Sequence, residues 1–190
     1  MRLSTPRLKP LTRSEYSDAQ REILAPLERG DDPPYNIFTT LAHHPRGAAA
    51  FLVWGTYALR NSLLPDRYRE LIILRIGVLG RSGYEWAQHV RLTQRIGFTS
   101  EDYARIKRGS TAEGWNDQER AVLQAAEELF RDQFIATATW NALQQFLTDP
   151  QRMDVVFVVG HYMQVCMALN TFGVQLDAGL SADPDFVATE

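Results

Sequence analysis

Two ionisable side chains spaced four residues apart are the clearest chemical signal in the sequence. Glu85 and His89 belong to the segment GYEWAQHV, whose pattern is helical, so both side chains share one face of a helix. A nearby carboxylate favours the charged imidazolium and burial opposes it, so such a pair can titrate close to neutral pH and transfer protons. The alternative is a surface pair that adds about 0.3 kcal/mol to helix stability. The spacing alone permits both interpretations.

Three further side chains surround this pair on the same expected helix. Ser82 lies one turn before Glu85 on the same face, and Trp86 lies one turn before His89. If the pair faces a pocket, Tyr84 and Trp86 can form its apolar wall and Ser82 can contact a substrate. Aromatic side chains at helical spacing also pack in protein cores, which is the competing interpretation. We therefore treat Ser82, Tyr84 and Trp86 as candidate substrate-binding residues.

Two charged residues occur in the strongly apolar segment RYRELIILRIGVLG. Glu70 is in the first turns of the helix expected there, where the helix dipole stabilises a carboxylate. Arg75 lies deeper in the apolar run, and a buried guanidinium needs a partner. Glu70, Glu85 or a carboxylate of another subunit can supply that partner. We therefore expect structural pairing of Arg75 rather than a catalytic role.

The last long apolar segment, VVFVVGHYMQVCMAL, contains a histidine and the only cysteine of the chain. His161 is either a hydrogen-bonded core residue or a polar group that contacts a substrate near neutral pH. Cys166 is expected to pack as a small apolar side chain. With one cysteine, the chain forms no internal disulfide and no Cys-x-x-Cys redox motif, which fits a reducing compartment such as the cytoplasm.

The sequence indicates neither a metal site nor a bound cofactor. His43 and His44 are adjacent, so about 100° of helix separates their side chains and they do not converge on one ion. Glu85 and His89 supply two ligands, whereas a catalytic zinc ion takes three from the protein. A Gly-rich phosphate loop, a dinucleotide fingerprint and a nucleophile elbow are all missing from the sequence. We therefore expect chemistry without a cofactor.

Composition narrows the expected partners and location. The chain has 190 residues, with 20 Lys and Arg against 23 Asp and Glu and a formal net charge of −3. Acidic and basic residues are interspersed, so the sequence has no basic stripe typical of nucleic-acid binding. The N-terminus lacks the continuous apolar stretch of a signal peptide, and the apolar runs are shorter than a membrane span. These features predict a cytoplasmic protein that binds neither nucleic acid nor membrane.

Helical spacing of apolar residues dominates the chain, and no alternating strand pattern competes with it. We predict an all-α compact fold in one domain over residues 1–175, followed by a C-terminal tail, residues 176–190, that is extended or mobile. Ser14 and Asn36 are expected to cap the first two helices, and the last long helix is expected to begin at Arg152.

The segment RYRELIILRIGVLGRSGYEWAQHVRLTQRIG resembles the core of the carboxymuconolactone decarboxylase family, which includes the AhpD-like alkylhydroperoxidases, and flanking segments extend the resemblance over residues 35–176. In the peroxidase branch, a Glu is followed after eleven residues by Cys-x-x-Cys and, after three more, by a His. Glu70 and His89 match the Glu and the His, whereas Ser82 and Glu85 occupy the two cysteine positions. The chain therefore resembles a branch without the Cys-x-x-Cys motif, and a serine cannot cycle through sulfenic acid and disulfide states.

The resemblance implies a fold and an activity. The fold would be an AhpD-like bundle of roughly seven to nine helices, and the activity a cofactor-free decarboxylation of a cyclic carboxylate or lactone from aromatic-compound breakdown. His89 would be the acid–base group, Glu85 would orient it or carry the proton, and Glu70 would fix the site or pair with Arg75. His161 would contact the substrate from the last helix.

Other functions remain compatible with the same residues. A proton-transfer or hydrolytic enzyme acting on another ring system would use the same Glu and His. A non-redox protein that binds a ligand or assembles with copies of itself would keep the scaffold without turnover. A thiol peroxidase is the least supported, because the two cysteines are missing.

The resemblance also implies assembly. Family members typically form trimers or hexamers, with pockets near subunit contacts. Two stretches, residues 48–59 and 75–79, carry more apolar side chains than one thin layer of helices hides. We therefore expect a homo-oligomer that binds a small-molecule substrate.

Overall fold

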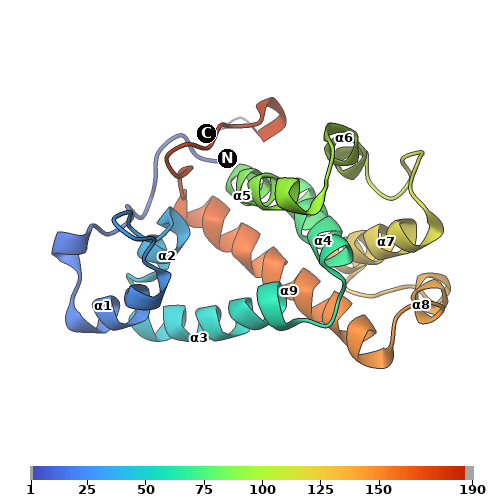
Figure 1. The fold of residues 1–190 in the computed structure, drawn as a ribbon, viewed down its shortest axis with the longest axis horizontal. Helices are drawn as coiled ribbons and strands as arrows, with labels where there is room; N and C mark the ends of the chain where they lie inside the picture. The colour runs from blue at the N-terminus through green and yellow to red at the C-terminus, as the bar shows by residue number, and fades with distance from the viewer. Residues whose placement is uncertain (1, 187–190) are drawn as a thin grey trace.

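The protein is an all-α bundle built around one long helix, which confirms the predicted fold class. The structure, a computed structural model, describes residues 2–186. In Figure 1, α9 runs diagonally through the molecule, with α1, α2 and α3 forming an arm on one side and α4 to α8 packed on the other. The described part of the chain contains nine α-helices and no strand. Their bounds are α1 Asp18–Leu24, α2 Asn36–Leu41, α3 Pro45–Thr56, α4 Asp66–Leu79, α5 Gly83–Thr93, α6 Ser100–Arg108, α7 Asp117–Asp132, α8 Thr137–Gln144 and α9 Asp149–Phe172.

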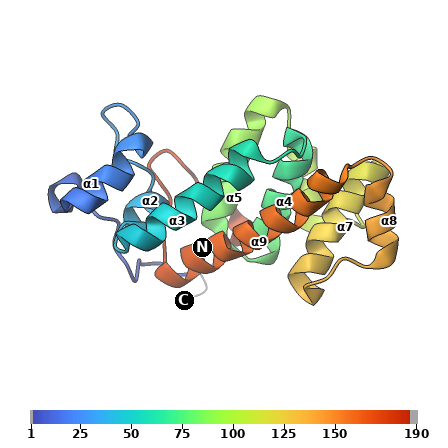
Figure 2. The same cartoon turned by 90° about the horizontal axis from the view of Figure 1, so that it is seen from below.

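The rest of the bundle covers α4. This helix packs against α5, α7 and α9, and Figure 2 shows it beside them. Leu71, Ile72, Ile73, Leu74 and Ile76 are all fully buried. A helix that is apolar on every side needs cover on every side, so this sequence places α4 in the centre of the fold. The charged residues within this apolar run are therefore buried with it.

Arg75 is one of these charges, and α7 supplies its partner. Arg75 Nε donates to Glu127 Oε1 at 2.9 Å, and Nη1 donates to the backbone carbonyls of Ile106 and Lys107 at 2.9 and 3.0 Å. Glu127 also accepts from the amide and the hydroxyl of Ser110. The partner is thus a carboxylate that the sequence analysis did not consider, and the pairing is structural.

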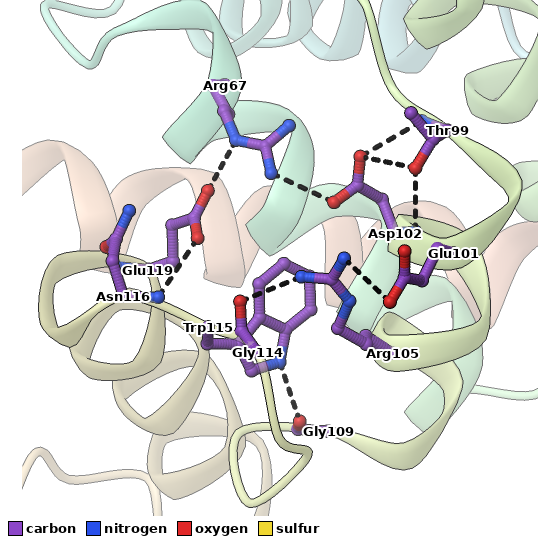
Figure 3. A network of polar contacts seen from close by, with 10 residues as sticks. All are labelled: Arg67, Thr99, Glu101, Asp102, Arg105, Gly109, Gly114, Trp115, Asn116 and Glu119. Carbon is purple, nitrogen blue, oxygen red and sulfur yellow. Dashed lines mark hydrogen bonds and ion pairs between the residues drawn. The ribbon is translucent and has the colours of Figure 1, made fainter.

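A polar network holds the beginning of α4 against α6 and α7 (Figure 3). Arg67 Nη2 donates to Asp102 at 3.0 Å, and Arg67 Nε donates to Glu119 at 2.5 Å. Asp102 also forms a capping box with Thr99 at the start of α6, and Glu119 forms one with Asn116 at the start of α7. Asp102 is 5% exposed and Glu119 is 6% exposed. One guanidinium therefore ties three helices together through two buried carboxylates.

The first two helices are capped differently from the sequence-based prediction. Ser17, rather than Ser14, caps α1: its hydroxyl accepts from the amide of Gln20 at 3.4 Å, and the Gln20 side chain accepts from Ser17 N at 2.8 Å. Asn36 is the first residue of α2 rather than its cap, and its side chain donates to the carbonyl of Gln175 at 3.1 Å. Asn36 therefore joins α2 to the segment after α9.

α9 is longer than the sequence predicts. It begins at Asp149 rather than Arg152, because Thr148 and Gln151 form a capping box that starts the helix earlier. At 24 residues it is the one helix among residues 2–186 that is long and apolar enough to cross a membrane by length and composition alone. Of its most apolar window, 44% is buried inside the fold. The buried side of α9 packs in the bundle, whereas Met153, Val156 and Met167 remain exposed on its outer side.

The segment after α9 is extended but packed onto the bundle. Asp177 accepts from the hydroxyl of Tyr84 on α5, and the ring of Phe186 stacks on that of Trp86 with 5.3 Å between centroids. Asp177 and Phe186 are both 7% exposed. The described part of the expected tail is therefore fixed at two points, and residues 187–190 lie outside the described residues.

Two adjacent acidic residues at the start of α6 test the network of Figure 3. Asp102→Ala removes one of the two carboxylates paired with Arg67 and half of the capping box of α6, while Glu119 still pairs with Arg67, so we expect the free energy of unfolding to fall by about 2 kcal/mol. Glu101→Ala is the matched control, because that side chain is 76% exposed and pairs with Arg105 at the surface; we expect a change of about 0.5 kcal/mol. Urea denaturation followed by circular dichroism measures both, and equal losses would contradict the role of Asp102.

Candidate functional site

A buried imidazole lies between two carboxylates where α4 meets α5. His89 Nδ1 lies 2.6 Å from Glu70 Oε2, and His89 Nε2 lies 2.9 Å from Glu85 Oε1. Glu70 is 3% exposed, Glu85 is 4% exposed and His89 is 5% exposed. The structure therefore brings together the three residues that the sequence analysis named for proton transfer.

The two carboxylates determine the charge of His89. Burial alone would lower the pKa of His89, but the charges and hydrogen bonds of Glu70 and Glu85 outweigh it and raise this pKa to about 10. Burial likewise acts to raise the pKa of Glu70, but His89 and Arg69 outweigh it, and the pKa of Glu70 falls below its usual value. At neutral pH, His89 is therefore an imidazolium whose two N–H groups each meet a carboxylate.

A tight turn between α4 and α5 brings these side chains together. Arg81 adopts a left-handed conformation with φ of 49°, and Ser82 N donates back to the carbonyl of Gly77 at 2.9 Å. The helices approach closely, because a Cβ added at Gly77 would lie 3.8 Å from Glu85 Cβ. One face of α5 thereby comes beside Glu70 on α4.

A cavity of about 640 Å³ lies beside the ionisable pair. Tyr84, Glu85 and His89 line it from α5, and His161 and Tyr162 line it from α9. Much of the remaining wall is apolar and comes from α2 and α3 with the turn that follows: Ile37, Phe38, Phe51, Leu52 and Leu59. The volume is that of a site for a small organic molecule. The pair therefore borders a space that a ligand can occupy.

His161 contributes an imidazole of a different character. It is 4% exposed, and its Nδ1 has no hydrogen-bond partner among the described residues. Burial lowers the pKa of His161, and the charge of Glu85 offsets this only in part, so the ring is neutral at neutral pH. Gly55 on α3 leaves room for it, since a Cβ there would lie 3.0 Å from His161 Nε2. The cavity wall thus contains a buried polar atom without a protein partner.

The hydroxyl of Tyr84 is bound by the segment after α9. Tyr84 Oη donates to Asp177 Oδ2 at 2.5 Å, and Gln88 Nε2 donates to the same oxygen at 2.6 Å. Burial and the charge of Asp177 raise the pKa of Tyr84 well above its usual value, so the phenol stays protonated. The backbone N–H of Asn36 donates to Asp177 Oδ1 at 2.8 Å. The sequence analysis missed Asp177, because an acidic residue in a polar tail carries no local signal of burial. It also missed Gln88 on α5, whose partner is Asp177.

Three of the residues named from the sequence do not line the cavity. Trp86 packs in a separate apolar core, where its ring stacks on Phe186. Ser82 is fully buried at the beginning of α5. Glu70 contacts His89 without reaching the cavity wall. The lining residues among the candidates are therefore Tyr84, Glu85, His89 and His161.

Cys166 packs against the same turn in a setting that suppresses thiol chemistry. Cys166 is 3% exposed. A Cβ added at Gly80 would lie 3.0 Å from the Cβ atom of Cys166. Burial raises the pKa of the Cys166 thiol well above its usual value, so the reactive thiolate is not formed at neutral pH. The chain has no second cysteine to form a disulfide with it.

The described residues contain no group of three or more His, Cys, Asp or Glu side chains arranged to hold a metal ion. Both nitrogens of His89 meet carboxylates, so neither offers a lone pair to a metal. Glu70, His89 and Glu85 are thus engaged with one another.

Several solved proteins share this fold. An uncharacterized peroxidase-related protein from Silicibacter sp. TM1040 has a TM-score of 0.78 at 14% identity, over 93% of this chain and 94% of that one. An uncharacterized peroxidase-related protein from Ralstonia eutropha JMP134, described as an alkylhydroperoxidase AhpD core, has a TM-score of 0.74 at 17% identity, over 95% and 96%. A variant of the debrominase Bmp8 in complex with 2,3,4-tribromopyrrole has a TM-score of 0.71 at 14% identity, over 92% and 94%. These similarities establish an AhpD-like fold.

The centre of the chain identifies the family. The carboxymuconolactone decarboxylase family matches residues 45–128, a region that includes Glu70, Glu85 and His89. No curated protein is similar enough to be matched to the chain. The match over residues 45–128 confirms the resemblance to the carboxymuconolactone decarboxylase family seen in the sequence, and the chain has the AhpD-like fold.

Proposed function

We propose that the protein is a cofactor-free lyase that removes carbon dioxide from a cyclic carboxylate or lactone, with Glu85 and His89 supplying the proton. The observation that carries the proposal is that these two residues are buried together and line a cavity of about 640 Å³. The family of residues 45–128 supports the reaction class. The debrominase Bmp8 complex supports a ring-shaped ligand, because tribromopyrrole is a five-membered ring held by a protein with this fold.

The reaction needs an acceptor for electrons and a source of one proton. When the bond to the carboxylate carbon breaks, carbon dioxide leaves and the electron pair moves into a neighbouring carbonyl, which becomes an enolate. The enolate carbon then takes one proton from the protein, and the carbonyl forms again. Water returns that proton to the protein and leaves as hydroxide, which carries the negative charge that the carboxylate lost, so atoms and charge balance without a further reactant.

The charge of His89 determines what His89 and Glu85 each do in the proposed reaction. An imidazolium with a pKa of about 10 is not a base at neutral pH, so His89 acts as a store for the proton. An enolate carbon is a stronger base than a carboxylate. Glu85 Oε1 lies 2.9 Å from His89 Nε2 without a hydrogen bond between them, so the carboxylate must first rotate into line with that N–H. As the enolate forms, the proton on Nε2 then crosses to Glu85, and Glu85 passes a proton to the carbon. Glu70 holds the imidazolium from its other side, at 2.6 Å.

His161 supplies a hydrogen bond to the oxygen of the enolate. Its ring is neutral, buried in the cavity wall, and has Nδ1 free of protein partners among the described residues. In the tautomer that carries hydrogen on Nδ1, a rotation of the ring turns this buried atom towards the cavity, where it donates to an oxyanion in a site with little water. Such a donor lowers the barrier to loss of carbon dioxide, because negative charge develops on that oxygen.

A ligand-binding protein without turnover is the alternative function. The observation that favours it is that carboxylates occupy both nitrogens of His89, an arrangement that also serves as a purely structural ion triad. This alternative predicts that the cavity binds a ring compound and returns it unchanged.

We also propose that the protein assembles with copies of itself through α3 and α9. Trp54 on α3 packs edge-on against Phe157 on α9, so the outer sides of the two helices form one surface. Exposed apolar side chains that lie together on one surface are typical of an interaction site. Residues 75–79 pack inside the bundle, so this part of the sequence-based argument is wrong. The most exposed apolar residues of the surface are Val53, Trp54, Met153, Val156 and Met167.

Replacing one carboxylate tests the proposed chemistry. Glu85→Gln keeps the size of the side chain and removes the group that passes the proton, so we expect carbon dioxide release from a panel of carboxylated lactones to fall about 100-fold. Glu101→Gln, which changes the same charge at the surface of α6, should leave the rate unchanged. Turnover that survives Glu85→Gln would end the assignment.

The charge of His89 makes the stability of the protein depend on pH. Its pKa in the folded protein, about 10, lies above the usual value of 6.5, so its contribution is complete below pH 6.5 and is lost as pH rises towards 10. We expect the free energy of unfolding to decline across this range, and nitrogen NMR to show both ring nitrogens of His89 protonated at neutral pH. A His89 ring that loses its proton near pH 6.5 would contradict the triad.

Light scattering tests the assembly. At micromolar concentration we expect the mass of more than one chain, with a trimer or a hexamer favoured by the family resemblance. Val53→Glu places a charge in the exposed apolar surface and should shift the mass towards a single chain. Arg108→Glu on α6, which is exposed and remote from α3 and α9, is the control. A single-chain mass for the unaltered protein would refute the proposal.

A further inference from the structure

The mouth of the cavity carries cationic side chains that the proposed chemistry does not use. Arg29 and Arg91 both line the cavity, and both guanidinium groups lie over the ring of Tyr35, with Cζ 4.1 and 4.9 Å from the ring centroid. Arg60 also lines the cavity. Arg29 and Arg60 are exposed and Arg91 is half-buried, so this part of the wall meets solvent.

Positive charge at this mouth is not neutralised. Within residues 2–186, Arg29, Arg60 and Arg91 form no ion pair with a carboxylate, and the hydrogen bonds of Arg29 and Arg91 go to neutral oxygens. The two carboxylates that line the cavity are already engaged: Glu28 pairs with Arg13 at 2.5 Å, and Glu85 lies 2.9 Å from His89. Among the residues that line the cavity, the charges left without a counter-charge are therefore all positive.

Tyr35 and Gln88 hold the two guanidinium groups in place. The Tyr35 ring attracts both cations, and Arg91 Nη2 donates to Gln88 Oε1 at 2.6 Å. Gln88 is itself fixed by Asp177, which accepts from its amide at 2.6 Å. An anion bound beside this ring would therefore meet the positive charge of both Arg29 and Arg91.

We propose that Arg29 and Arg91, positioned by Tyr35, form an anion-recognition site at the mouth of the cavity. The ligand that fits is an apolar ring that carries a carboxylate which the reaction leaves in place. That carboxylate binds the guanidinium groups, and the ring lies among the apolar side chains of the wall, such as Phe51 and Leu59. The inference rests on the proposed function, because it places the substrate in the same cavity.

A carboxylate bound at the mouth is not the one that leaves. Hydrogen bonds from guanidinium groups stabilise a carboxylate and therefore oppose its conversion to neutral carbon dioxide. Loss of carbon dioxide is favoured instead near the proton donor and the neutral imidazole, where Glu85 and His161 line the wall. The cavity thus binds a ring at two points of different character, an anion at the mouth and a reacting group beside Glu85.

Equilibrium binding of naphthoate and its neutral analogue naphthamide tests the site without requiring turnover. The two probes share a ring system and differ in charge. We expect naphthoate to bind about tenfold more tightly than naphthamide in calorimetry, because it meets two guanidinium groups. Added salt should reduce the difference, because the mouth is open to solvent. The combined variant Arg29→Gln and Arg91→Gln should bind both probes equally.

Arg95→Gln is the matched control for this experiment. Arg95 is exposed on the turn after α5, one turn beyond Arg91, and does not line the cavity. Its replacement should leave the preference for naphthoate unchanged, and circular dichroism confirms that each variant is folded. Equal binding of the two probes to the unaltered protein, binding of neither, or a preference that survives the combined variant would overturn the inference.

The outcome is separable from that of Glu85→Gln. A preference for naphthoate in a protein that releases no carbon dioxide from any tested lactone would refute the lyase and leave the anion site standing. Turnover that depends on Glu85, together with equal binding of the two probes, would support the lyase and refute the anion site.

Discussion

The buried ion triad of Glu70, His89 and Glu85 is the interaction on which the rest of the structure depends. Removing one member of such a group leaves a buried charge unpaired, at a cost of about 3–5 kcal/mol. The triad therefore fixes α5 on α4, and the buried pairs of Arg67 and Arg75 fix α4 on α6 and α7 in the same way. Packing set by several buried charges also keeps the 2.9 Å separation between Glu85 and His89 that a proton must cross.

The two histidines of the cavity show how contacts, rather than residue type, decide charge. Both are at least 95% buried, and burial lowers the pKa of each. His89 touches two carboxylates and is charged, whereas His161 touches none and is neutral. A charged proton store and a neutral hydrogen-bonding group on one cavity are the two components that a reaction through an enolate requires.

Local pattern determines what can be predicted from this sequence. The spacing of Glu85 and His89 on one helix, and the burial of α4, follow from the helical repeat and from apolar residues on every side. The partner of Arg75 is 52 residues away on α7, and Asp177 reaches α5 from a polar segment with no apolar pattern. Trp86 points to the second apolar core, because which neighbours cover each face of a helix is a property of the whole fold.

Glu85 stands where the peroxidase branch has its second cysteine, and a carboxylate at this position can transfer protons but not electrons. The peroxidase branch of the family that the sequence resembles has thiols where this chain has Ser82 and Glu85. A carboxylate has no accessible oxidation step, but it holds the adjacent imidazole in its charged form and can accept that proton. Cys166 lies near the same turn, yet its buried thiol stays protonated. The chain therefore keeps Glu70 and His89 but has no sulfur at the two cysteine positions, and the proposed proton transfer uses the carboxylate that stands at the second one.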